Sequence, residues 1–216
     1  MKKYIVLMVF AYWWGILHTV AQTYTLSELR AWPSTEAEGD LDKDGVKDLV
    51  IIATPDFKEN FIVDDGDTID TNVPILAIFK GKKDGSFTSW RQYDEALPPK
   101  PGIFVSVYFS LDINDRGVLT VGLDYFSSAG SWASTNCSFV YRFQNGDFYL
   151  IGEDNNSFMR NSGEADNYSY NYLTHKKQHV KFNMFDDKVK PRETWSNLPQ
   201  KPLKRLGSFV MESSEM

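Results

Sequence analysis

Residues 39–52 read GDLDKDGVKDLVII, and this stretch decides how the rest of the chain is interpreted. Four aspartates fall within nine positions and are followed directly by apolar residues: Asp40, Asp42, Asp44 and Asp48. Carboxylates at positions 1, 3, 5 and 9 of a tightly coiled loop can converge on one centre. Position 6 of such a loop needs a sharp turn, and Gly45 allows it because glycine adopts positive φ without a Cβ penalty.

Calcium prefers oxygen ligands, roughly six to eight of them, so the loop is predicted to bind one structural calcium ion. Its expected ligands are the side chains of Asp40, Asp42, Asp44 and Asp48 and the backbone carbonyl of Val46. Leu41 is expected to pack inward, and Lys43 and Lys47 to point to solvent. The alternative is a solvated acidic turn. Like charges about 4 Å apart repel by roughly 4 kcal/mol at an effective dielectric of 20, so converging carboxylates need a cation.

The residues after the loop distinguish it from an EF-hand, because position 12 is Ile51 rather than glutamate and a strand-forming run follows. The loop, the apolar run 75–79 with Gly81, and the turn 84–87 (DGSF) resemble the FG-GAP/VCBS type of repeat. This resemblance covers about residues 37–90. It implies a blade-like β-meander with calcium held by the five positions named above. Since one unit cannot close a ring of blades, an open sheet or sandwich is expected rather than a propeller.

The first 21 residues have the layout of a secretory signal peptide. Lys2 and Lys3 precede an uncharged apolar run of 14 at positions 4–17, which is shorter than the roughly 20 residues that span a bilayer. Cleavage after Ala21 leaves residues 22–216, which are expected to form a single β-rich domain. The predicted location is therefore periplasmic or extracellular, without membrane insertion after cleavage.

Charge and cysteine content narrow the possible partners. The formal net charge of −6 becomes −8 once Lys2 and Lys3 are removed, which argues against nucleic acid and anionic membranes as partners. Cys137 is the only cysteine, so no internal disulfide can form. A small buried residue is a better interpretation of Cys137 than a nucleophile, because no cysteine–histidine signature surrounds it.

Short apolar runs between dense turn signals predict an all-β fold, an antiparallel meander or sandwich with one blade-like calcium-loop unit and little helix. The expected strands are residues 23–26, 49–53, 75–79, 87–93, 104–111, 118–125, 138–143, 147–151, 168–174 and 180–185. Residues 27–32 can form one helical turn capped by Ser27. Residues 54–74 and 153–166 are expected to be loops, and the tail from Lys188 to wrap the surface.

Other groups of residues have weaker signals. His175 and His179 are predicted to flank a hairpin turn and to lie at the surface rather than share a metal. The acidic run 64–70 is interpreted as a solvated loop. Four tryptophans are assigned mainly to the core, and one of them, in the loop 127–135, is expected to be exposed: Trp32, Trp90, Trp132 and Trp195.

These features favour a non-enzymatic, exported calcium-binding domain whose partner is a protein or a glycan. Two alternatives remain open. One is a carboxylate-dependent hydrolase that uses Asp56, Asp64 or Asp67, and the other is a subunit of a larger surface assembly.

Overall fold

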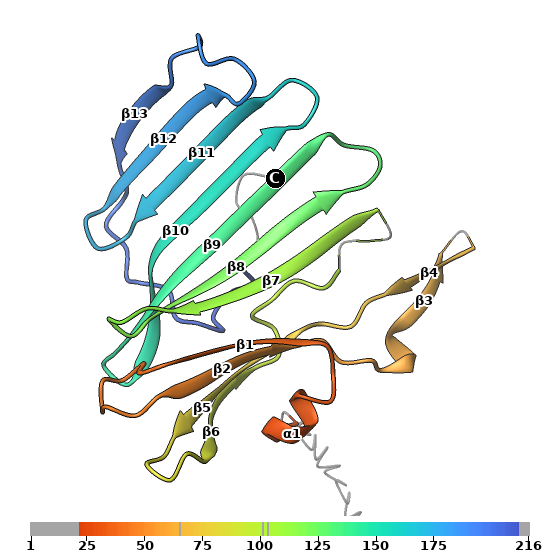
Figure 1. The fold of residues 1–216 in the computed structure, drawn as a ribbon, viewed down its shortest axis with the longest axis vertical. Helices are drawn as coiled ribbons and strands as arrows, with labels where there is room; N and C mark the ends of the chain where they lie inside the picture. Colours follow the sequence, from red (N-terminus) through yellow and green to blue (C-terminus); the bar gives the residue numbers. More distant parts are fainter. Residues whose placement is uncertain (1–21, 65, 101, 103, 212–216) are drawn as a thin grey trace, which may run out of the picture.

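The structure is a computed structural model that describes residues 22–64, 66–100, 102 and 104–211. The predicted signal peptide therefore lies outside the described residues. The chain is all-β: two antiparallel sheets, one short hairpin and very little helix (Figure 1). In the described part no helix is long and apolar enough to cross a bilayer.

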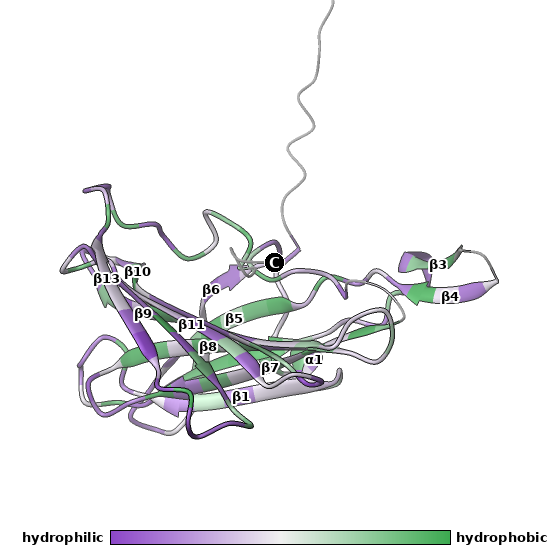
Figure 2. Cartoon of the chain, turned by 90° about the horizontal axis from the view of Figure 1, so that it is seen from above, coloured by the Kyte–Doolittle hydropathy of each residue, from purple (hydrophilic) through white to green (hydrophobic). Residues whose placement is uncertain are grey.

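The smaller sheet has four antiparallel strands in the order β1-β2-β5-β6. These are β1 (Ser34–Gly39), β2 (Asp48–Ala53), β5 (Ile75–Gly81) and β6 (Phe87–Tyr93). Every residue of β2 is buried because both faces of this sheet are covered, which explains its continuous apolar run. In Figure 2, β5 is correspondingly hydrophobic along most of its length.

The larger sheet is a seven-stranded meander in which each strand pairs with the next. Its strands are β7 (Val105–Ile113), β8 (Val118–Ser127), β9 (Ala133–Gln144), β10 (Asp147–Met159), β11 (Glu164–Asn171), β12 (Lys176–Asn183) and β13 (Arg192–Asn197). Alternate residues of its central strands are buried, so one face of this sheet is turned toward the core.

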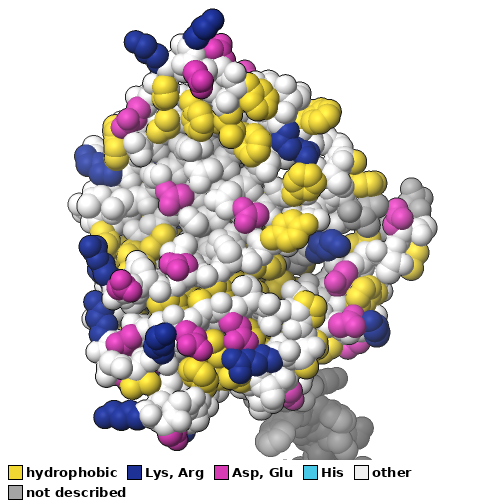
Figure 3. All heavy atoms as spheres, viewed as in Figure 1, with side chains coloured by type: hydrophobic (Ala, Val, Ile, Leu, Met, Phe, Trp, Pro, Cys, Tyr) yellow, Lys and Arg dark blue, Asp and Glu magenta, His cyan; other side chains and the backbone are white. Residues whose placement is uncertain are grey.

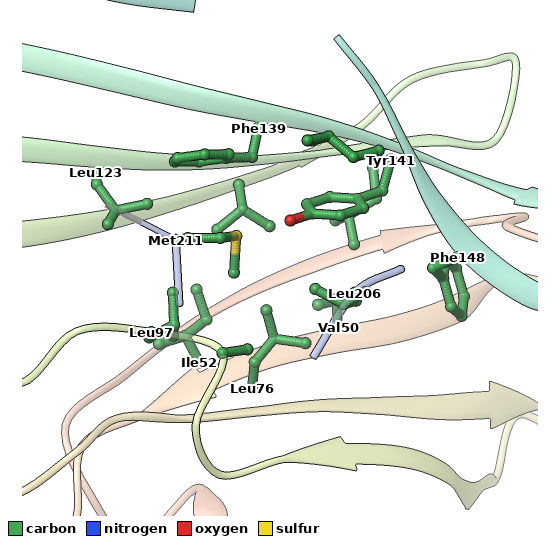
Figure 4. Close-up of a cluster of buried hydrophobic side chains, with 14 of the residues drawn as sticks. Val50, Ile52, Leu76, Leu97, Leu123, Phe139, Tyr141, Phe148, Leu206 and Met211 are labelled. Atoms are coloured by element: carbon green, nitrogen blue, oxygen red, sulfur yellow. The ribbon is translucent and has the colours of Figure 1, made fainter. Parts of the chain in front are cut away.

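The two sheets share one hydrophobic core (Figure 4). Val50 and Ile52 of β2 and Leu76 of β5 face Phe139 and Tyr141 of β9 across it. The other face of the four-stranded sheet packs on α1 (Leu26–Leu29) through a second cluster that includes Leu29, Leu49 and Ile51. Side chains of β2 thus alternate between two apolar environments.

The C-terminal tail does more than wrap the surface. It first adds strand β13, and it then crosses the inner face of the larger sheet, where Leu206 and Met211 are buried in the shared core. Backbone hydrogen bonds hold it: the Leu206 N–H donates to Phe148 O at 2.9 Å, and the Met211 N–H to Ala96 O at 2.8 Å.

Two further sequence predictions, both in the N-terminal half of the chain, were wrong. The expected strand 23–26 does not form: residues 23–25 lead into α1, which begins at Leu26. The capping box of α1 joins Thr25 and Glu28, so Thr25 rather than Ser27 is the cap. The expected loop 54–74 contains a 3₁₀ turn (Lys58–Asn60) and the hairpin of β3 (Phe61–Asp64) and β4 (Asp67–Asp70).

The remaining differences between the expected and the observed strands involve strands made largely of polar residues. The expected loop 153–166 is the long continuation of β10, the following turn and the start of β11. Likewise β1, with the sequence STEAEG, carries no apolar pattern. These strands form because neighbouring strands supply their hydrogen bonds, even where one face is solvated.

Candidate metal centre

The acidic loop, residues 40–47, joins β1 to β2 and is wedged between two glycines from other elements. A Cβ on Gly81, at the end of β5, would overlap the carbonyl oxygen of Lys47. A Cβ on Gly117, in the turn between β7 and β8, would overlap the carbonyl oxygen of Asp40. Both sheets therefore approach the loop closely, and its backbone position is set by tertiary packing.

Three of the predicted ligands come together. Asp40, Asp42 and Asp48 each offer a carboxylate oxygen, and these atoms all lie within 4.8 Å of one another. Asp48 is fully buried, and the other two are half-buried. This acidic triad can hold a metal ion.

Hydrogen bonds within the loop coil it around the Asp40 carboxylate. The Asp44 N–H donates to Asp40 Oδ1 at 3.0 Å, and the Gly45 N–H donates to Asp40 Oδ2 at 2.8 Å. The Val46 N–H in turn donates to Asp44 Oδ1 at 2.9 Å. Lys43 and Gly45 both have positive φ, at 64° and 86°, so the sharp turn predicted at Gly45 is confirmed.

Asp48 ties the loop to β5. Its carboxylate accepts from the Leu41 N–H at 3.1 Å and from the Gly81 N–H at 3.0 Å. Burial raises the pKa of Asp48 above its usual value, although the two amide hydrogen bonds act in the opposite direction. A cation beside Asp48 would favour its ionised form.

Lys80, on β5, brings a positive charge to the cluster. Its Nζ contacts the Asp42 carboxylate and lies 2.9 Å from Asp44 Oδ2. The hydrogen bond from Lys80 lowers the pKa of Asp44. Burial acts to lower the pKa of Lys80, but the bonds to Asp42 and Asp44 outweigh it and the pKa is raised.

One oxygen in the cluster is left unsatisfied. Asp42 Oδ1 is buried and has no hydrogen-bond partner among the described residues. A buried carboxylate oxygen without a partner carries a desolvation cost that a bound cation would remove. Lys80 supplies one positive charge against four aspartates, so the donor set fits a hard cation that prefers oxygen ligands.

The packing of the loop is as predicted for several residues. Leu41 is buried, and Lys43 and Lys47 are exposed. Asp44 forms an ion pair with Lys80 and is not part of the triad. The role of the Val46 carbonyl stays a prediction. Lys80 was missed, although pairing the apolar runs 49–53 and 75–79 in the observed register would have placed it beside Asp48.

The remaining candidates are placed elsewhere. Cys137 is buried, as expected. His175 lies in the turn between β11 and β12, whereas His179 lies on β12, 2.6 Å from Asp166 and stacked on Tyr168.

Acidic residues proposed for hydrolysis lie on or before the small hairpin. Asp56 forms an ion pair with Lys58 at 2.7 Å, and Asp67 is exposed. Asp64 lies on β3, opposite Asp67. Trp132 is exposed, as predicted, and so is Trp195, which was not predicted.

Comparison of this chain with family models, with curated proteins and with solved structures gave no match.

Proposed function

We propose that this chain is an exported, non-catalytic β-domain whose acidic loop is fixed to the sheets by one calcium ion, and which acts by binding a protein or a glycan. The observation that carries the calcium proposal is the unsatisfied Asp42 Oδ1, which lies with the carboxylates of Asp40 and Asp48. The three clustered carboxylates, of Asp40, Asp42 and Asp48, favour calcium over softer metals, because the cluster offers oxygen donors rather than imidazole or thiolate.

The position of the loop supports a structural role for the ion. Loop residues 40–47 lie between Gly81 of the smaller sheet and Gly117 in the turn that joins β7 to β8 of the larger sheet. A cation there would hold these parts together and neutralise the carboxylates that packing forces into proximity. The resemblance to an FG-GAP/VCBS repeat is part of this proposal, and it is supported by a four-stranded antiparallel sheet with the acidic loop between its first two strands.

Thermal unfolding with and without calcium tests the proposal. We expect 1 mM calcium to raise the melting temperature above its value in a chelator. A site with a dissociation constant of about 10 µM would add about 2.7 kcal/mol, or roughly 5–10 °C for a chain of this size. The double variant Asp42→Asn, Asp44→Asn should lose this dependence, while Asp187→Asn, the same change at an exposed aspartate of the tail, should keep it.

Equal melting temperatures of the wild-type protein in calcium and in chelator would refute the calcium site. A magnesium arm at the same concentration tests selectivity, because magnesium demands a stricter octahedral geometry and should stabilise less.

A further inference from the structure

We propose that the outer face of the seven-stranded sheet, the face turned away from the shared core, binds an uncharged polysaccharide. This inference rests on the proposed binding role and names the ligand class for it. Figure 3 shows this face as a field of polar side chains with few charges, bordered by aromatic and other apolar side chains. Its residues alternate with the buried ones: on β9, Cys137 and Phe139 point inward, so Asn136 and Ser138 point outward.

The strand register places short polar side chains in rows across this face. One row, with one residue from each of five successive strands, consists of Tyr108, Asp124, Asn136, Asn156 and Asn167. Asn136 Nδ2 donates to Asp124 Oδ1 at 2.6 Å. The side chains of Asn156 and Asn167 have no hydrogen-bond partner in the described part of the chain. Each amide therefore presents donors and an acceptor to a ligand.

The neighbouring row ends at an exposed tryptophan. It runs from β9 to β13 through Ser138, Asp154, Ser169, Gln178 and Trp195. A hollow of about 410 Å³ is lined by the last four of these together with Asn171 and Lys176, among others. The indole of Trp195 is 62% exposed, and its Nε1 donates to Glu193. This hydrogen bond orients the ring beside hydroxyl and amide groups.

A second cluster of exposed aromatic side chains lies on the same face, at β8 and the loop before β9, away from Trp195. Phe126 of β8 and Trp132 in the loop before β9 are 41% and 59% exposed. The guanidinium of Arg160 lies 4.4 Å from the Phe126 ring and 5.9 Å from the Trp132 ring. It also donates to the carbonyl of Ser131 at 3.1 Å and of Trp132 at 3.3 Å. These exposed rings are thus held in place, which lowers the entropy cost of stacking a ligand on them.

The chemistry of this surface matches a neutral sugar chain. Sugar rings offer apolar C–H faces that stack on aromatic rings, and hydroxyl groups that pair with amides and hydroxyls. A phosphate- or carboxylate-bearing polymer would meet Asp124 and Asp154 and an acidic chain, whose net charge is −6 before and −8 after the proposed cleavage. A protein partner needs a desolvated apolar centre, whereas the centre of this face is made of asparagine, serine and aspartate.

Native gel electrophoresis with polysaccharide cast into the gel tests the proposal. The probes are β-glucan, xyloglucan, arabinoxylan and galactomannan, with polygalacturonate as the anionic comparison. We expect at least one uncharged polymer to retard the wild-type protein. Trp195→Ala should weaken that binding roughly tenfold, the loss of one aromatic stacking contact. Val63→Ala, at an exposed residue of the β3–β4 hairpin, should leave it unchanged.

The outer face, taken as a sugar-binding surface, is called the platform below. Three results would overturn the platform: no retardation by any uncharged probe, equal retardation of Trp195→Ala and wild type, or retardation by polygalacturonate alone that is lost at high salt. Running the gels in calcium and in chelator separates the two proposals. Retardation in both buffers supports the platform whatever the melting curves show. Calcium-dependent melting without retardation overturns the platform and leaves the calcium site intact.

Discussion

Lys80 is the residue that sets the charge balance of the acidic loop. Its Nζ reaches Asp42 and Asp44 from the adjacent strand, and it lies 5.1 Å from the centre of the Trp90 ring. Without a metal ion, this ammonium partly offsets the repulsion among the aspartates. A bound calcium would compete with it for the same carboxylates, so Lys80 lowers the calcium affinity that the four aspartates would otherwise have.

Replacing Lys80 by methionine should therefore have opposite effects in the two buffers. In chelator we expect Lys80→Met to lose about 1 kcal/mol of stability, since a half-buried ion pair is broken. Its calcium affinity should rise by about fivefold, because the competing charge is gone. Calcium titration followed by calorimetry measures the affinity, and thermal unfolding in chelator measures the stability. Lys188→Met, at an exposed tail lysine, is the matched control, and an unchanged calcium affinity in Lys80→Met would contradict the competition.

At the scale of elements, the turn between β7 and β8 braces the acidic loop. Asn114 Oδ1 accepts from the Arg116 N–H at 2.9 Å and from the Val118 N–H at 3.2 Å, which shapes the turn. Gly117 then follows with φ of 67° and lies against the carbonyl of Asp40. A side chain at this position would push the two elements apart.

Gly117→Ala should consequently destabilise the protein by about 2–4 kcal/mol, through both positive φ and steric overlap. Gly146→Ala is the matched control. Gly146 also has positive φ, at 81°, in a hairpin turn, but no atom would contact its Cβ within 4 Å. We expect a loss of about 1–2 kcal/mol there. Urea denaturation measures both values, and equal losses in the two variants would refute the bracing role of Gly117.

For the whole molecule, the C-terminal tail closes the core that the two sheets share. Met211 is fully buried among side chains from both sheets, whereas its neighbour Val210 is 41% exposed. Because one core serves both sheets, they are expected to unfold together.

Met211→Ala should cost about 2–5 kcal/mol, the range for a large-to-small change in a core, and Val210→Ala much less. Within each variant, tryptophan fluorescence and far-ultraviolet circular dichroism should report the same urea midpoint, as a cooperative transition requires. Separate midpoints for the two probes would show that the sheets do not unfold as one unit.

Elements with strong local signals were predictable. Residues 49–53 and 75–79 are apolar and β-branched, and both are strands; Asn145 and Gly146 mark the turn of a hairpin. Strands β1 and β13 were not predictable, because polar residues form them and their pairing partners supply the only signal.

The sequence by itself determined the chemistry of the acidic loop, because aspartate spacing and the position of a glycine are local properties of the chain. It also determined the all-β character through alternating and continuous apolar runs. Only the tertiary structure decided that Lys80 enters the aspartate cluster and that polar and aromatic side chains align in rows across five successive strands. Both depend on strand register, and a shift of one residue would turn every side chain of a strand to the opposite face.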